Sequence, residues 1–263
     1  MPAIPVDSID DPRLAPYREL NQRNLTRHSG LFIAEGDKVT ERLIASRYPV
    51  ASILAEADWA ERLGPALPPE TPIYVAQRRL LAETIGFQFH RGVLGCGRRL
   101  PGPNIVEAMA RHADQSTILV CPDVQDPTNL GSIIRTAAAF GCAAIVLGGR
   151  CADPFSRRVL RVSMGAALHL PIIESGDIAA DLAALRQADY TLVASVIDAA
   201  AEPLADFKRP AKLALLVGSE GHGLSAELRS LCHRQVTIPM RLGIDSLNVA
   251  VAAAVFLYHL TPQ

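Results

Sequence analysis

The stretch "LLVGSEGHGLS" (residues 215–225) places three apolar residues directly before a short segment with one acid and three glycines. An apolar run that ends at a glycine is typical of a buried strand followed by a loop whose backbone can approach another group closely. Glu220 is then expected at the tip of that strand. Two explanations fit an acid there: a solvated turn, or a carboxylate directed at a ligand.

The composition is that of an ordinary globular protein. Of 263 residues, 49 % are hydrophobic and 20 % are charged, and the net charge is -1. These values exclude a fibrous or wholly disordered chain, and any binding of nucleic acid must depend on local patches. The sequence contains no secretory pattern and no run of about 18 apolar residues, so we expect a cytoplasmic protein without a membrane span. Five widely spaced cysteines without a C-x-x-C pair predict neither disulfides nor a metal site.

A division of the chain is expected at "RRLPGPNI" (residues 98–105), where a basic pair meets a P-G-P turn. Before it, strand-like runs at 31–34, 50–54, 73–75 and 92–94 alternate with helical patterns such as "DKVTERLIAS", which predicts a small α/β domain. After it, strand candidates lie at 117–121, 142–147, 191–196, 213–217 and 236–238. Strands that are apolar throughout favour a parallel sheet covered on both faces.

The segment "DPTNLGSIIRTAAAFGCAAIVLGG" (residues 126–149) reads as a turn, a helix and the next strand. Asn129 can cap the helix, Gly141 should end it, and Arg135 lies off its apolar face. For Arg135, a solvated surface arginine is the alternative to a role at a site.

A second helix is predicted in "IPMRLGIDSLNVAVAAAVFLYHL" (residues 238–260). From Val249 to Leu257 it is apolar on every side and is therefore expected to be buried. Ser246 suits the N-cap. The amide of Asn248 has several hydrogen bonds to satisfy, and either a ligand or a backbone loop could satisfy them.

Nucleotide signatures do not fit the glycine segment. Gly218, Gly221 and Gly223 give G-x-x-G-x-G, whereas the dinucleotide fingerprint is G-x-G-x-x-G after the first strand, and no P-loop sequence is present. This order of glycines argues against a nucleotide-dependent oxidoreductase.

Taken together in order, the three segments resemble one known family. N-x-G-x-x-x-R at Asn129 to Arg135, G-x-E-x-x-G at Gly218 to Gly223 and S-L-N at Ser246 to Asn248 closely resemble the SpoU/TrmH family of RNA ribose 2'-O-methyltransferases, part of the SPOUT class, over residues 117–260. Residues 31–44 and 90–95 also look like the substrate-binding domain that many of these enzymes carry.

The resemblance implies an α/β protein with residues 1–103 as an N-terminal RNA substrate-binding domain and linker. Residues 104–263 would form a SPOUT methyltransferase domain, with a parallel sheet and a deep trefoil knot. The implied cofactor is S-adenosylmethionine, and the implied assembly is a homodimer through the C-terminal domain. The implied cofactor-binding residues are Leu216, Val217, Gly218, Glu220, Gly223, Ile238, Met240, Ser246, Leu247 and Asn248.

The resemblance also assigns roles in catalysis. Arg135 matches the family's catalytic arginine. A guanidinium stays protonated up to about pH 12, so we expect it to stabilise the developing alkoxide and a neighbouring phosphate. Asn129 and Glu220 would position Arg135 and the ribose, with Asn248 on the cofactor side.

RNA contacts are predicted at six arginines in two segments, one near the linker and one resembling the family segment after the second strand. They are Arg91, Arg98, Arg99, Arg157, Arg158 and Arg161. We expect ribosomal RNA as substrate ahead of transfer RNA, with a non-catalytic RNA-binding relic of the same fold as the rival hypothesis.

Overall fold

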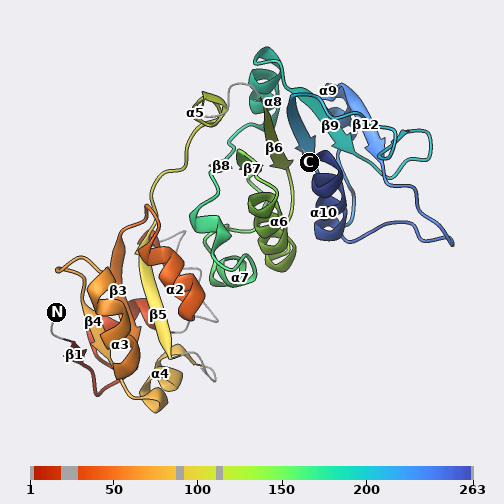
Figure 1. The fold of residues 1–263 in the computed structure, drawn as a ribbon. Helices are drawn as coiled ribbons and strands as arrows, with labels where there is room; N and C mark the ends of the chain where they lie inside the picture. Colours follow the sequence, from red (N-terminus) through yellow and green to blue (C-terminus); the bar gives the residue numbers. More distant parts are fainter. Residues whose placement is uncertain (1–2, 19–28, 87–91, 111–114, 262–263) are drawn as a thin grey trace. The chain divides into compact units, whose positions relative to one another are not determined.

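A computed structural model describes residues 3–18, 29–86, 92–110 and 115–261 (Figure 1). The chain divides into two compact units. The first comprises Met1–Pro101 and Asp153–His169, and the second comprises Gly102–Ala152 and Leu170–Gln263. Within the described ranges, no helix has both the length and the apolar character needed to cross a bilayer.

The first unit contains a five-stranded mixed sheet in the order β1-β4-β3-β5-β2. Strand β5 (Val93–Arg98) runs antiparallel to both β2 (Leu31–Glu35) and β3 (Val50–Ala55), whereas β4 (Ile73–Val75) runs parallel to β3 and to β1 (Ile4–Pro5). Because side chains alternate across a strand, Ile53 and Leu54 belong to separate buried clusters on the two faces. The strands expected at 31–34, 50–54, 73–75 and 92–94 correspond to β2, β3, β4 and the start of β5.

The helices of the first unit are short. They are α2 (Asp37–Ile44), α3 (Ala57–Leu63), α4 (Arg78–Ile85) and α7 (Arg157–Val162), with 3-10 turns at Pro12–Tyr17, Gly64–Ala66 and Ala166–Leu168. Helix α7 comes from the middle of the chain, yet it contacts β2.

The second unit is built on a seven-stranded sheet in the order β10-β12-β9-β11-β6-β7-β8, and every pairing in it is parallel. The strands are β6 (Ser116–Cys121), β7 (Ala144–Leu147), β8 (Ile172–Glu174), β9 (Thr191–Ser195), β10 (Glu202–Pro203), β11 (Lys212–Leu216) and β12 (Arg234–Thr237). The expected parallel sheet is confirmed. Strands β1, β8 and β10, of two or three residues each, were not predicted.

Five α-helices of the second unit are described: α5 (Ile105–Ala110), α6 (Pro127–Ala139), α8 (Ile178–Gln187), α9 (Ala226–Leu231) and α10 (Val249–Leu260). The N-cap of α6 is Asp126, whose carboxylate accepts from the backbone N–H groups of Thr128 and Asn129, both at 2.8 Å. The prediction that Asn129 caps this helix is wrong, because Pro127 fixes the first helical position one residue after the aspartate. Gly141 follows the helix with φ +69°, as expected of a helix stop.

Helix α10 begins at Val249 and packs against α6. Its N-cap is Asn248, which accepts from the N–H groups of Ala250 and Val251. Ser246 lies two residues too early, so the prediction that it caps the helix is wrong. The expectation that residues 249–257 are buried on every side is also wrong within one chain, because Val251 is 50 % exposed and Val255 is 39 % exposed.

Candidate active site at the carboxyl ends of the parallel strands

The strand order opens a crevice between β6 and β11. In the strand order, β7 lies on one side of β6, whereas β12 lies in the opposite direction from β11. Where adjacent parallel strands connect in opposite directions, their following loops separate and leave room for a ligand beyond the carboxyl ends of the strands. Asn129 lies in the first turn of α6, which follows β6, and Glu220 lies in the loop after β11.

The glycine loop, residues 218–225, is a tight turn that closes on itself. Ser219 and Gly223 exchange two backbone hydrogen bonds of 3.2 and 3.1 Å. A Cβ at Gly218 would come within 2.2 Å of the Gly223 carbonyl carbon, and Gly223 itself has φ +62°. Both positions therefore require glycine, whereas a side chain at Gly221 would enter open space.

Three polar side chains from distant parts of the chain form one hydrogen-bonded series. Asn248 Nδ2 donates to Asn129 Oδ1 at 2.9 Å, and Asn129 Nδ2 donates to Glu220 Oε1 at 2.7 Å. The direction is forced, because a carboxylate can only accept and the Asn248 oxygen already accepts from the first turn of α10. Residues 129, 220 and 248 thus converge as the sequence motifs predicted.

A cavity of about 420 Å³ lies beside this series, between the glycine loop and the segment after β12. Seven of the residues expected to bind the cofactor line it: Gly218, Glu220, Gly223, Ile238, Met240, Ser246 and Leu247. Leu216 and Val217 are buried and do not line it. Asn248 borders a different groove, between α6 and α10.

Several residues that line this cavity belong to none of the motifs recognised in the sequence. Ser195 ends β9, the neighbour of β11, and Val196 and Ile197 follow it; they reach the cavity for that reason. Arg229 of α9 also lines it, and its buried Nε makes no hydrogen bond within the described ranges. The position of β9 beside β11 would have indicated the first three residues, but strand order is not readable from the sequence.

Arg135 is exposed on α6 and borders none of the cavities described here. It forms no hydrogen bond or ion pair with any residue that the structure describes, including Asn129 and Glu220. The structure therefore brings together three of the four expected catalytic residues and shows no contact between Arg135 and those three.

The arginines expected to contact RNA differ in their surroundings. Arg98 at the end of β5 and Arg158 on α7 are exposed. Arg99 pairs with Asp153 at 3.4 Å, while Arg157 and Arg161 pair with the buried Glu35 at 2.8 and 3.4 Å. Arg91 lies outside the described residues.

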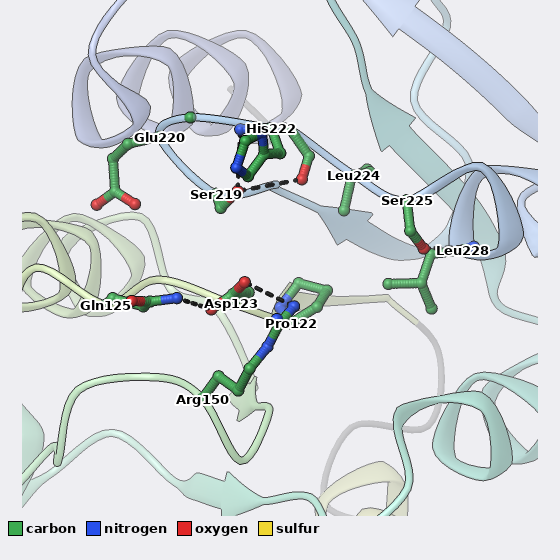
Figure 2. A pocket seen from close by; sticks show the side chains of 12 residues that line it. Pro122, Asp123, Gln125, Arg150, Ser219, Glu220, His222, Leu224, Ser225 and Leu228 are labelled. Atoms are coloured by element: carbon green, nitrogen blue, oxygen red, sulfur yellow. Dashed lines mark hydrogen bonds and ion pairs between the residues drawn. The ribbon is translucent and has the colours of Figure 1, made fainter.

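A second cavity, of about 510 Å³, borders the other side of the glycine loop (Figure 2). The loop after β6 supplies Asp123 and Gln125, and the loop after β7 supplies Arg150. The sequence motifs gave no indication of these three residues. Over the part of the chain that the structure describes, no group of three His, Cys, Asp or Glu side chains is suited to a metal ion.

Comparison with known proteins identifies the class and then the family. Residues 116–258, more than half of the chain, match the model of the SpoU rRNA Methylase family. The fold, with its cavities at the strand ends, is that of a methyltransferase, and the chain belongs to the SpoU family.

Relatives match over nearly the whole length. An uncharacterised tRNA/rRNA methyltransferase of Mycobacterium bovis is 39 % identical over 96 % of this chain and 89 % of its own. The 23S rRNA (guanosine(2553)-2'-O)-methyltransferase RlmP of Bacillus subtilis is 27 % identical over 97 % of this chain and 98 % of its own. The SpoU methyltransferase AviRb of Streptomyces viridochromogenes, solved with the cofactor AdoMet, superposes with a TM-score of 0.81 at 25 % identity, covering 95 % and 97 %.

Proposed function

We propose that this chain transfers a methyl group from S-adenosylmethionine to a ribose 2'-hydroxyl of ribosomal RNA. Membership of the SpoU family makes it an S-adenosylmethionine-dependent RNA 2'-O-methyltransferase. The choice of ribosomal RNA rests on the full-length similarity to a 23S rRNA enzyme. The observation that carries the proposal is the series Asn248–Asn129–Glu220 beside the cavity at the strand ends.

The cavity suits the proposed cofactor. A volume of about 420 Å³ is within the range of pockets that enclose small molecules. Ile238 and Met240 supply apolar wall, and the unpaired Nε of Arg229 can donate to an acceptor on a bound molecule. Glu220 and Asp245 add negative charge at the lining, which favours a cationic ligand. When bound, the cofactor supplies an electrophilic methyl group on a sulfonium.

Asn129 and Glu220 would hold the ribose in line with the methyl group, because positioning is the main requirement of a displacement reaction. Arg135 would bind the phosphate next to the reacting nucleotide and stabilise the oxygen as it loses its proton. An exposed guanidinium with no partner among the described residues is available for an RNA phosphate.

We also propose that two copies pair through the groove between α6 and α10. Its lining includes Phe140 of α6 and Val251, Val255 and Tyr258 of α10, an apolar face that one chain leaves uncovered. Ser132, one turn from Arg135, borders the same groove, so a dimer formed here would place Arg135 near the interface.

The dimer has a matched test. Val255→Glu should convert the protein to monomers in analytical ultracentrifugation, because a charge would be buried against the partner. Val106→Glu, at an exposed apolar position of α5 in the same unit, should leave the dimer intact. A monomeric wild-type protein at micromolar concentration would refute this part of the proposal.

A trefoil knot in the second unit is proposed from the path of its last elements. The segment after β12 and the glycine loop line the same cavity, and α10, which follows that segment, packs against α6. Pulling the chain from both ends in a force experiment should give a final extension shorter than that of an unknotted chain. Full extension would exclude the knot.

The first unit is proposed to bind the RNA substrate, with Arg98 and Arg158 as exposed contacts. The cytoplasm is the proposed compartment.

The choice of substrate has a direct test. Incubation with labelled cofactor, intact ribosomal RNA and total transfer RNA should place the label in ribosomal RNA. Label confined to transfer RNA would overturn the choice of substrate.

The catalytic assignment is tested with Arg135→Ala. Transfer to RNA should fall at least ~100-fold, the usual cost of losing a group that stabilises the transition state, while calorimetry should show unchanged affinity for S-adenosylmethionine. Arg135→Lys, which keeps the charge, should recover part of the loss. Unchanged turnover would remove the role of Arg135, and no cofactor binding by the wild type would favour a non-catalytic relic.

A further inference from the structure

The second cavity shares a wall with the first. Residues from Ser219 to Leu224 line both, so the glycine loop separates two spaces at the same edge of the sheet. Glu220 borders both cavities and also accepts from Asn129. A molecule in the second cavity therefore lies across a single loop from the proposed cofactor.

The floor of this cavity is held in place by bonds between two loops. Gly148 N donates to Cys121 O at 2.9 Å, and Ala152 N donates to Val124 O at 2.9 Å. Between them, the Cys151 thiol donates to Cys121 O and accepts from Val124 N. Burial raises the pKa of the Cys151 thiol, which keeps it protonated as a donor. Asp123 and Arg150 thus project from two loops that are fastened together on both sides.

Asp123 is the central polar group of the floor (Figure 2). Gln125 Nε2 donates to its Oδ1 at 2.9 Å, and Arg150 Nη2 lies 2.7 Å from its Oδ2. A carboxylate has about four lone-pair sites, so each oxygen can accept one more hydrogen bond. The two partners fix the plane of the carboxylate, and the Arg150 side chain, 77 % exposed, has further N–H groups to donate.

Only one RNA base matches a carboxylate with a donor beside it. Guanine presents two adjacent donors, N1–H and N2–H, with the O6 acceptor next to them. Adenine and cytosine place one donor beside an acceptor, and uracil places one donor between two acceptors, so each of these would set an acceptor against the carboxylate.

We infer that the second cavity binds the base of the nucleotide to be methylated, and that Asp123, held by Gln125 and Arg150, selects guanine. The inference rests on the proposed function and adds its substrate base. The cavity volume of about 510 Å³ suits a single nucleotide. Asp123 and Arg150 are then specificity-determining residues that touch the base and not the reacting atoms.

The first test is the identity of the product. RNA methylated by the wild-type protein is digested to nucleosides and separated by mass spectrometry, with 2'-O-methylguanosine expected. Methylation of adenosine, cytidine or uridine alone would overturn the inference and leave the proposed function standing. Methylation of no RNA would overturn both.

The second test removes one donor from the base. The substrate is an RNA fragment in which inosine, which lacks the N2 amino group, replaces the guanosine that is methylated. For the wild type, kcat/KM should fall about 10-fold or more, the usual cost of one lost base contact. Asp123→Asn should lower kcat/KM on guanosine about 10- to 100-fold and should no longer distinguish inosine from guanosine.

A matched variant separates specificity from general damage. Asp206→Asn changes an exposed carboxylate of the same unit and should behave as wild type on both RNAs. Calorimetry should give Asp123→Asn the same affinity for S-adenosylmethionine as wild type. Equal rates of the wild type on guanosine and inosine would overturn the role of Asp123.

Discussion

The two units use buried and polar side chains in different ways. In the second unit, Asn129, Glu220 and Asn248 bond to one another beside two cavities, and two of the three are exposed. In the first unit, Glu35 is 5 % exposed and is paired with Arg157 and Arg161. In a parallel sheet the loops that follow the strands lie together at the carboxyl ends of the strands, where polar groups can bind a ligand. In the mixed sheet the buried charge of Glu35 holds helix α7 in place instead.

This contrast assigns chemistry to the second unit and packing to the ion pairs of the first. It predicts that changes in the glycine loop act on cofactor binding, whereas changes at Glu35 act on stability alone.

The largest effect is expected at the turn of the glycine loop. Gly218→Ala would place a Cβ against backbone atoms of Gly223 and Leu224, so the loop must shift. We expect a loss of about 2–4 kcal/mol in the free energy of unfolding and no measurable binding of S-adenosylmethionine. Gly221→Ala, at a position with open space, should keep both properties. Equal behaviour of the two variants in urea unfolding and calorimetry would contradict the closed loop.

A smaller effect is expected in the first unit. Glu35→Gln removes the charge that faces Arg157 and Arg161, and since those arginines are partly exposed the cost should be about 1–2 kcal/mol of stability. Cofactor affinity should not change. Glu41→Gln, which breaks only surface pairs with Lys38 and Arg62, should cost at most about 0.5 kcal/mol. A loss of cofactor binding in Glu35→Gln would break the division between the units.

The smallest effect concerns pH. Burial lowers the pKa of His233 in the second unit and of His169 in the first. A histidine whose pKa is lowered by folding is protonated more readily in the unfolded chain. Its contribution to the free energy of unfolding is therefore present above pH 6.5 and is lost as the pH falls below that value. Calorimetric melting should occur at a lower temperature at pH 5.5 than at pH 7.5. His233→Gln should reduce that difference, and a higher melting temperature at the acidic pH would contradict the sign.

Much of the fold and of the site was predictable, because each motif follows a strand. The apolar run before Gly218 and the turn at Asp126 place Glu220 and Asn129 at strand ends, and the carboxyl ends of parallel strands share an edge. What the sequence lacks is the strand order, which brings β6 beside β11 and so creates the second cavity. Asp123 and Arg150 therefore carried no signal.

Other features depended on partners that the local pattern does not reveal. Arg157 was predicted to bind RNA, yet it pairs with Glu35, 122 residues earlier. The run from Val249 to Leu257, apolar on every side, predicted burial all round. The structure leaves Val251 and Val255 exposed, because packing against α6 covers only part of the surface of α10. The cap of α10 was misplaced since both Ser246 and Asn248 are good N-cap residues.

The convergence of distant loops on one site is tested most directly by a double-mutant cycle on methyl transfer. Asn248→Asp keeps the oxygen that caps α10 but loses the N–H that reaches Asn129, and Asn129→Ala removes the middle of the series. If the series acts as a unit, the double variant should be little worse than Asn129→Ala, with a coupling energy of about 1 kcal/mol or more in kcat/KM. Additive losses would show that the two asparagines act independently and would contradict a single shared site.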